Sequence, residues 1–428
     1  MPQYLSPGIY VEEAPSAARP IAGVGTSTAG FIGEVADTII MPLKPGKTGL
    51  TGTATEPNEF YKLAAAGEPT LVTSWEQFKN NFGDIKADNQ TLAHAVYGFF
   101  NNGGTRCWVI RLAPGSTSQS KSSQTQAARG AGADAADPNE APKKTSPTAA
   151  KPSLNDALAR FAGIDEIAIV AFPGAFDKAQ HQSILTHCFT LKDRTAVLDG
   201  VKSVDSLTAE KIAPAARDEA GSYGAVYFPW IKVADPSGTI VDMPPSGHIA
   251  GIYARNDATR GVHKAPANEV VLGALDLTRL VSKAEQDGLN PEGVNIVRSL
   301  NGALTVWGAR TRAAEAQSDF KYVSTRRFFN FLRKSIEQGT QWVVFEPNTP
   351  ALWQSITRNV TAFLTNLWRA GALFGDTPQQ AFYVKCDADT NAPDQRELGW
   401  VVIEVGVAIV RPAEFVIFRI GQWAGPGK

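Results

Sequence analysis

The sequence predicts an α/β fold of mixed α+β character, divided among more than one domain. Between residues 165 and 233, apolar strand-like runs alternate with a helical segment, as in a buried sheet covered by helices. Near the C-terminus, an amphipathic helical pattern precedes a strand pattern with a two-residue period. A chain of 428 residues is long enough for two or three domains with large cores.

Individual elements follow from local composition. Residues 113–153 contain no large apolar side chain, so this segment cannot bury enough surface to offset its ordering entropy, and we expect a flexible surface insertion. The strands expected on either side of it lie within 31–35, 70–74, 107–112, 165–173, 195–200 and 223–233. Helices are expected at about 91–100 and 181–191.

Two helices are expected in the last hundred residues. Thr349 and Pro350 supply an N-cap and a first helical position, an apolar stripe follows, and Gly371 ends the helix. An earlier helix at about 325–338 carries several aromatic residues and four basic ones, and we expect the basic side chains on its outer surface. They are Arg326, Arg327, Arg333 and Lys334.

A strand with one β-branched face is expected after these helices. Its members on that face are Val401, Ile403, Val405, Val407 and Ile409, which alternate with smaller or polar residues. This pattern predicts a core strand.

Both ends of the chain have strand character. Prolines flank the run Gly8, Ile9, Tyr10, Val11 and Glu12. After Pro412, an apolar segment contains Phe415, Val416, Ile417, Phe418 and Ile420 on its two faces. Unpaired strands of this kind expose backbone N–H and C=O groups as well as apolar surface, so they need a sheet to join. The sequence leaves two alternatives open: the chain's own sheet, or a sheet in a neighbouring copy.

Composition argues against several function classes. Lys and Arg total 41 and Asp and Glu total 42, so the net charge of −1 provides no general field for nucleic acid. The three cysteines are far apart and odd in number, which argues against a disulfide framework. The N-terminus has no signal-peptide pattern, and no window approaches a membrane span. We therefore expect synthesis in the cytoplasm, without membrane insertion.

Candidate catalytic and ligand motifs are incomplete. Lys47 follows Gly46 as in a phosphate loop, but Met41 occupies the position where that motif requires its first glycine. The closely spaced His181, His187 and Cys188 lack a further ligand at metal-site spacing. We therefore expect no cofactor and no metal.

A hydrolase is the alternative function that the sequence leaves open. It would use Ser246 and His263, although no nucleophile-elbow motif surrounds the serine. The polar segment that contains both residues, 244–271, is also compatible with a bonded turn network or a subunit contact. Its polar members are Arg255, Asp257, Arg260, His263, Lys264 and Asn268.

A resemblance to the contractile tail sheath proteins of phages and phage-tail-like injection systems covers nearly the whole chain. The segments that carry it are SPGIYVEE (6–13), RPIAGVGTSTAGFIG (19–33), FFNNGGTRCWVIRL (99–112), YGAVYFPWI (223–231), PPSGHIAGIYARNDATRGVHKAPAN (244–268), LNPEGVNIVR (289–298), VWGARTR (306–312), QWVVFEPN (341–348) and RPAEFVIFRI (411–420). Only the insertion 113–153 departs from the family's pattern.

The resemblance implies a structural, non-enzymatic subunit. Such subunits form stacked six-membered rings around an inner tube, and the helical lattice contracts from a metastable extended state to drive the tube through a target envelope. The implied partners are further copies, the inner tube protein, and baseplate and terminator or cap proteins. It implies no nucleic acid and no direct membrane insertion. The particle, a phage tail or a tail-like device, would assemble in the cytoplasm.

The resemblance also implies a domain plan. Residues 1–22 would form an N-terminal arm, 23–311 an outer domain with a subtilisin-like fold and no catalytic triad, 312–412 an inner, tube-facing domain, and 413–428 a C-terminal arm. Strands from the arms, at Ser6–Glu13 and Ala413–Ile420, would join a neighbour's sheet, and the strand at 401–409 would receive them. The four basic residues of helix 325–338 are our candidates for the tube contact.

Overall fold

A computed structural model describes residues 20–47, 59–115, 151–214 and 217–417. Its contacts divide the chain into two compact units. The described residues within 25–331 and 411–417 form the large unit, and those within 20–24 and 332–410 form the small unit. The predicted arm strand at 6–13 and residues 116–150 of the insertion 113–153 lie outside the described residues, as do Phe418 and Ile420.

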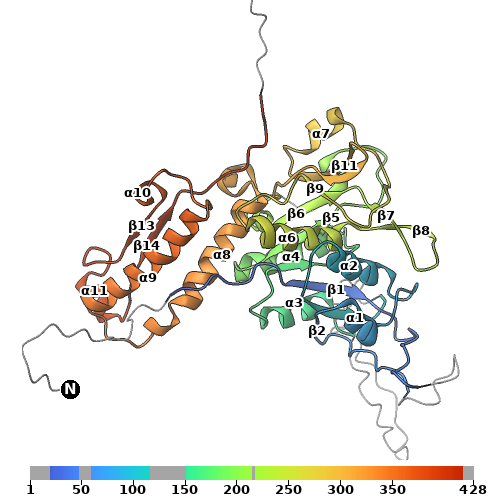
Figure 1. The fold of residues 1–428 in the computed structure, drawn as a ribbon, viewed down its shortest axis with the longest axis horizontal. Helices are drawn as coiled ribbons and strands as arrows, with labels where there is room; N and C mark the ends of the chain where they lie inside the picture. The colour runs from blue at the N-terminus through green and yellow to red at the C-terminus, as the bar shows by residue number, and fades with distance from the viewer. Residues whose placement is uncertain (1–19, 48–58, 116–150, 215–216, 418–428) are drawn as a thin grey trace, which may run out of the picture. The chain divides into compact units, whose positions relative to one another are not determined.

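A nine-stranded sheet forms the framework of the large unit, in the order β2-β3-β1-β4-β5-β6-β11-β12-β9 (Figure 1). In this order, the six strands β3, β1, β4, β5, β6 and β11 are parallel to one another. Strand β2 pairs antiparallel with β3, and β12 pairs antiparallel with both β11 and β9. The strands are β1 (Ala29–Glu34), β2 (Thr70–Val72), β3 (Cys107–Leu112), β4 (Ile169–Ala171), β5 (Thr195–Asp199), β6 (Gly224–Phe228), β9 (Glu269–Val270), β11 (Val294–Leu300) and β12 (Ala303–Val306). A second sheet joins β10 (Asp276–Leu277), β7 (Ile231–Ala234) and β8 (Ile240–Met243).

Helices cover both faces of the nine-stranded sheet. Alternate strand residues point to opposite faces, so Phe31 packs in one core and Ile32 in the other. The first core includes α1 (Trp75–Phe82), α2 (Gln90–Asn101) and α6 (Ser246–Arg260), and the second includes α3 (Leu154–Ala162) and α4 (Lys178–Leu191). The short helices α5 (Ala209–Ile212) and α7 (Lys283–Leu289) complete this unit. The mixed α/β prediction is therefore confirmed.

The tightest helix pair in the large unit is α2 with α6. A Cβ on Gly247 would lie 2.3 Å from the Ala95 carbonyl oxygen, and one on Gly251 would lie 2.5 Å from the Phe99 carbonyl oxygen. Both glycines therefore let the two helix backbones meet directly. The segment that the sequence marked as dense in polar and small residues thus begins as a packed helix.

Residues 332–410 carry the remaining helices and a two-stranded sheet. Helix α8 (Val323–Gly339) continues from the large unit into this stretch and is followed by α9 (Pro350–Arg369), α10 (Pro378–Ala381), β13 (Phe382–Lys385), α11 (Pro393–Glu397) and β14 (Glu404–Val407). In α9, the predicted apolar stripe is buried at Leu352, Ile356, Val360, Phe363 and Leu364. Thr349 stands at the N-cap with Pro350 in the first turn, and Gly371 follows the helix with φ 76°, as predicted.

Candidate functional site

The root of the predicted C-terminal arm lies in the large unit. The Glu414 carboxylate accepts hydrogen bonds from Arg310 Nε and Nη2, each at 2.7 Å, from Asn290 Nδ2 at 2.7 Å and from the Tyr322 hydroxyl at 2.9 Å. Burial alone would raise the pKa of Glu414, but the hydrogen bonds from Arg310, Asn290 and Tyr322 hold it below its usual range. Glu414 therefore stays ionised in a site that is mostly shielded from water.

The arm changes character directly after Glu414. Phe415, Val416 and Ile417 are 71%, 69% and 79% exposed, so three consecutive large apolar side chains face solvent. These residues have no assigned strand in the isolated chain. The predicted apolar segment is thus unpaired at 415–417, and such a segment can add to the edge of another sheet.

The predicted receiving strand lies in the small unit. It is shorter than expected: only Glu404–Val407 forms a strand, antiparallel to β13, with a single further bridge from Ile409 to Leu373. Residues 401–410 are exposed or partly buried throughout, so the prediction of a core strand is wrong. With only two strands, the sheet has too few neighbours to bury a β-branched face within one copy.

Several large apolar side chains of the small unit are exposed. Tyr383 on β13 is 59% exposed and covers Gly406 on β14, where a Cβ would lie 2.1 Å from the tyrosine ring. Among the described residues of this unit, the other large apolar side chains that are exposed are Val344, Phe345, Phe374, Leu398 and Trp400. A half-buried two-stranded sheet with this surface can accept further strands.

Of the four basic residues that were predicted on the outer surface of helix α8, two are buried. Arg333 is exposed and Lys334 partly buried, but Arg326 and Arg327 are buried, at 7% and 4% exposure. The prediction of four outward-facing basic residues is therefore wrong for Arg326 and Arg327. Their part of α8 packs inside the large unit, where polar partners replace water.

Buried partners explain the position of both arginines. Arg327 donates to both carboxylate oxygens of Asp257, at 2.8 and 2.6 Å, and to the Thr26 carbonyl oxygen at 2.9 Å. The guanidinium of Arg326 lies 3.5 Å from the ring centroid of Phe320 and 4.0 Å from that of Tyr223. These are structural contacts of the folded subunit, since both arginine side chains are buried among them.

The proposed hydrolase pair is not assembled. Ser246 begins α6, whereas His263 follows the end of that helix, and the helical rise places the two ends about 21 Å apart. The Ser246 hydroxyl donates to Asp199 at 2.7 Å, and both side chains are completely buried. Burial raises the pKa of Asp199 to about 7, although hydrogen bonds from Ser246 and Gly174 oppose that shift. Asp199 also accepts a hydrogen bond from the Ser246 backbone N–H at 2.8 Å, so a carboxylate from β5 caps the first turn of α6.

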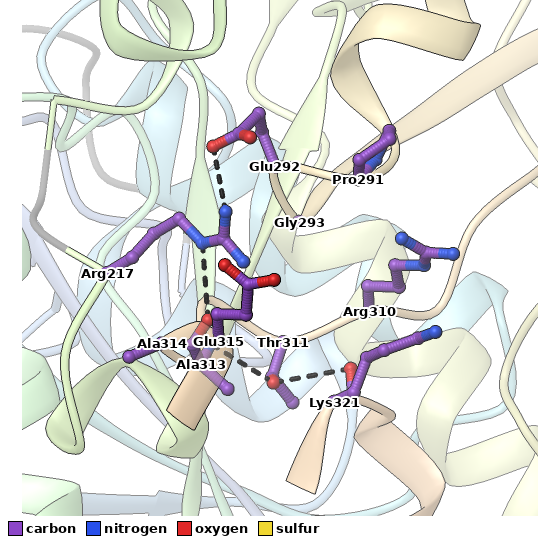
Figure 2. Close-up of a pocket in the computed structure, with 10 residues that line it drawn as sticks. All are labelled: Arg217, Pro291, Glu292, Gly293, Arg310, Thr311, Ala313, Ala314, Glu315 and Lys321. Atoms are coloured by element: carbon purple, nitrogen blue, oxygen red, sulfur yellow. Dashed lines mark hydrogen bonds and ion pairs between the residues drawn. The ribbon is translucent and has the colours of Figure 1, made fainter. Parts of the chain in front are cut away.

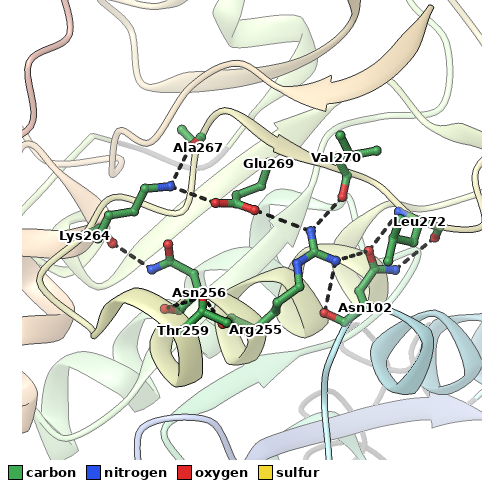
Figure 3. Close-up of polar contacts among 9 residues, drawn as sticks. All are labelled: Asn102, Arg255, Asn256, Thr259, Lys264, Ala267, Glu269, Val270 and Leu272. Atoms are coloured by element: carbon green, nitrogen blue, oxygen red, sulfur yellow. Dashed lines mark hydrogen bonds and ion pairs between the residues drawn. The ribbon is translucent and has the colours of Figure 1, made fainter.

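The polar segment after α6 forms a bonded turn network, which Figure 3 shows. Arg255 donates to the Val270 carbonyl oxygen at 2.8 Å and lies 3.6 Å from Glu269, which also pairs with Lys264 at 2.9 Å. Asn102 binds the backbone of Leu272 through both its amide atoms. This network ties residues 261–272 to α2 and α6, so the turn-network alternative holds within one subunit.

A pocket of about 330 Å³ lies beside the root of the C-terminal arm (Figure 2). Arg217 crosses it, donating to Glu292 at 2.8 Å and to the Ala313 carbonyl oxygen at 3.2 Å, and Arg310 and Lys321 also line it. The described residues that line it supply paired charges and backbone groups, and none of them is a serine, cysteine or histidine. Among the described residues, no group of three or more His, Cys, Asp or Glu side chains is arranged to hold a metal.

The sequence did not predict the site at Glu414. Its partners come from positions 290, 310 and 322, which no spacing rule connects with residue 414. The signal in the sequence that could have indicated this site was one carboxylate residue, Glu414, directly before the apolar run that begins at Phe415. Asp199 was also missed, because its partner Ser246 is 47 residues away.

Comparison with known proteins decides the family. The models described as phage tail sheath protein central domain and phage tail sheath C-terminal domain match residues 147–312 and 315–422, which together are more than half of the chain. The chain belongs to the phage tail sheath family. A tail sheath protein of Vibrio phage KVP40 is 29% identical over 41% of this chain, but the match spans only 25% of that relative's length.

Solved structures of contractile injection systems match almost the entire sheath protein. One is a chain of the helical sheath of the anti-feeding prophage in its contracted state, with 27% identity, a TM-score of 0.68, and coverage of 97% of this chain and 99% of the other. A chain in the six-fold symmetrised baseplate structure of the same prophage has 26% identity, a TM-score of 0.68, and coverage of 98% and 99%. No helix in the described parts of the chain is long and apolar enough to cross a membrane.

Proposed function

We propose that this sheath family member is the structural, non-enzymatic subunit of a contractile sheath. Subunits form six-membered rings stacked helically around an inner tube, and the lattice contracts from a metastable extended state. The observation that carries the proposal is the match of 97% of the chain to a subunit of a contracted helical sheath. The separation of Ser246 from His263 supports a role without catalysis.

The proposal assigns the two unpaired surfaces to contacts between copies. The arm that begins at Phe415 adds to the half-buried sheet of β13 and β14 in another copy, and the N-terminal arm at 6–13 does the same. Exposed apolar residues in the arm and beside that sheet support this pairing, because joining them removes apolar surface from water. Contacts that pass from copy to copy without closing produce a helical filament.

The other partners follow from the family role. The inner tube, the baseplate and a terminal cap protein bind the assembled sheath, and no nucleic acid is required. With Arg326 and Arg327 buried, Arg333 and Lys334 stay as candidates for the tube contact. The particle is a phage tail or a tail-like injection device, assembled in the cytoplasm.

The test is electron microscopy of the purified full-length chain. Tubes with helical striations are expected, and chains lacking residues 1–14 or 415–428 should stay folded but form no continuous tube. The second truncation leaves Glu414 and its partners in place. Continuous, wild-type tubes from both truncated chains would contradict strand exchange, and a wild type that forms no tubes with its tube and baseplate proteins would contradict the sheath function.

A further inference from the structure

The C-terminal arm is rooted in a different unit from the chain that precedes it. Residues 332–410 belong to the small unit, yet residues 411–417 group with the large unit. Within the described part of the chain, no backbone hydrogen bond holds residues 411–417. The root of the arm is therefore held by side chains.

Among the described residues, two ion pairs hold this root, and they differ in burial and geometry. Arg411 pairs with Asp319 at 2.9 Å, but the two side chains are 56% and 79% exposed, and such surface pairs add little stability. Arg310 and Glu414 are only 9% and 19% exposed, and the guanidinium binds both carboxylate oxygens. Bidentate, shielded pairs of this kind are both stronger and more directional.

The site is also built around the carboxylate. Asn290 and Tyr322 complete four hydrogen bonds to Glu414, and Arg310 Nη1 donates to the Asn290 carbonyl oxygen at 3.1 Å. The side chains that donate hydrogen bonds to Glu414 thus come from separate parts of the large unit and converge on one residue of the arm. One residue later, the chain carries exposed apolar side chains.

We propose that Glu414, held by Arg310, Asn290 and Tyr322, is the anchor that fastens the C-terminal arm to the large unit, so that the part of the arm that moves to a second copy begins at Phe415. This inference rests on the proposed sheath function. It adds that tension in the arm passes into the nine-stranded sheet unit through one carboxylate, rather than into the small unit that precedes the arm in sequence.

The anchor can first be tested in the unassembled chain. A nitroxide label at Ala413→Cys, in a Cys386→Ser background, reports the mobility of the arm root. Glu414→Ala should sharpen the spectrum of this label, whereas Arg411→Ala, the matched control, should leave it unchanged. An unchanged spectrum in Glu414→Ala, or equal sharpening in both variants, would overturn the proposal whether or not the chain forms a sheath.

Assembly provides the second test, with tube formation measured by sedimentation and microscopy. Glu414→Ala should raise the protein concentration needed for half-assembly about tenfold, Glu414→Gln by less, and Arg411→Ala not at all. The melting temperature of the unassembled double variant Arg310→Met with Glu414→Ala, which leaves no unpaired charge at this site, should stay within a few degrees of wild type. Arg310→Met combined with Glu414→Ala should assemble no worse than the poorer single variant, because the two residues act through each other.

The outcomes separate this inference from the proposed function. A wild type that does not assemble with its partners contradicts the sheath role, while the label experiment still decides the anchor. A wild type that assembles at the same concentration as Glu414→Ala contradicts the anchor alone. A large drop in the melting temperature of the Arg310→Met, Glu414→Ala double variant would assign this pair to fold stability and also overturn the inference.

Discussion

The buried pair of Arg327 and Asp257 gives the sharpest stability prediction. Their side chains are 3% and 5% exposed, and Thr26 Oγ1 also donates to Asp257, at 2.5 Å. Arg327→Met leaves the Asp257 carboxylate buried with the threonine hydroxyl and no positive charge beside it. Removing one member of a buried pair costs about 3–5 kcal/mol, because the remaining charge has lost both water and its partner.

The same reasoning sets the size of the change in melting temperature. The large unit has roughly 300 residues, and an unfolding entropy of about 2.1 cal/mol/K per residue gives about 0.6 kcal/mol/K. Arg327→Met should therefore lower the melting temperature of this unit by about 5–8 °C, measured by calorimetry of the unassembled chain.

Two controls use neighbouring basic residues of the same helix. Arg326→Met removes contacts to the Ser222 hydroxyl and to the rings of Phe320 and Tyr223, and Glu219 is only a more distant charge, so its cost should be smaller. Arg333→Met, at an exposed position, should change the melting temperature by about 1 °C or less. Equal melting temperatures for Arg327→Met and Arg333→Met would refute the assignment of Arg327 to a buried pair.

Three further predictions concern packing and the buried cap. Gly251→Ala should lower the free energy of unfolding by about 3 kcal/mol or more, because the added methyl group forces α2 and α6 apart. Gly288→Ala is the control: it lies in α7, no heavy atom lies within 4 Å of the added Cβ, and the change should be neutral or stabilising. Thermal melts of the two variants test this contrast. Ser246→Ala should cost about 1–2 kcal/mol in urea unfolding by removing one hydrogen bond to Asp199, and a loss of hydrolytic activity would contradict the cap assignment. Burial raises the pKa of Asp199 to about 7, so folding favours its protonated form, and the stability gained is complete below about pH 4 and lost as the pH rises to 7. Relative to Asp199→Asn, the unfolding free energy of the wild type should fall by up to about 4 kcal/mol across this window, and a difference independent of pH would show that Asp199 is ionised throughout.

Elements with a strong periodic pattern were predictable from sequence. Helix α9 begins at Pro350 and carries the predicted buried stripe, because its cap, first turn and apolar spacing all agree. The strands β1, β3 and β5 were also found, since buried parallel strands are continuous apolar runs. Strand β14 was predicted too long and too buried. Alternating side chains indicate that a strand has one apolar face, but they do not show whether the same copy supplies a layer that covers this face.

Charged residues were the least predictable. Arg326 and Arg333 look alike in sequence, but one stacks on Phe320 inside the large unit and the other is exposed. The anchor at Glu414 joins residues separated by 92 to 124 positions, and no local rule brings them together.

The sequence by itself determined the family, the mixed α/β class and the apolar character of the segment that follows Pro412, because these depend on residue order and local periodicity. Only the tertiary structure decided which arginines are buried, how little of the two-stranded sheet is covered, and where the C-terminal arm is fastened. The physical reason is that burial and ion pairing depend on groups far apart in the chain, whose positions relative to one another exist only once the units have folded.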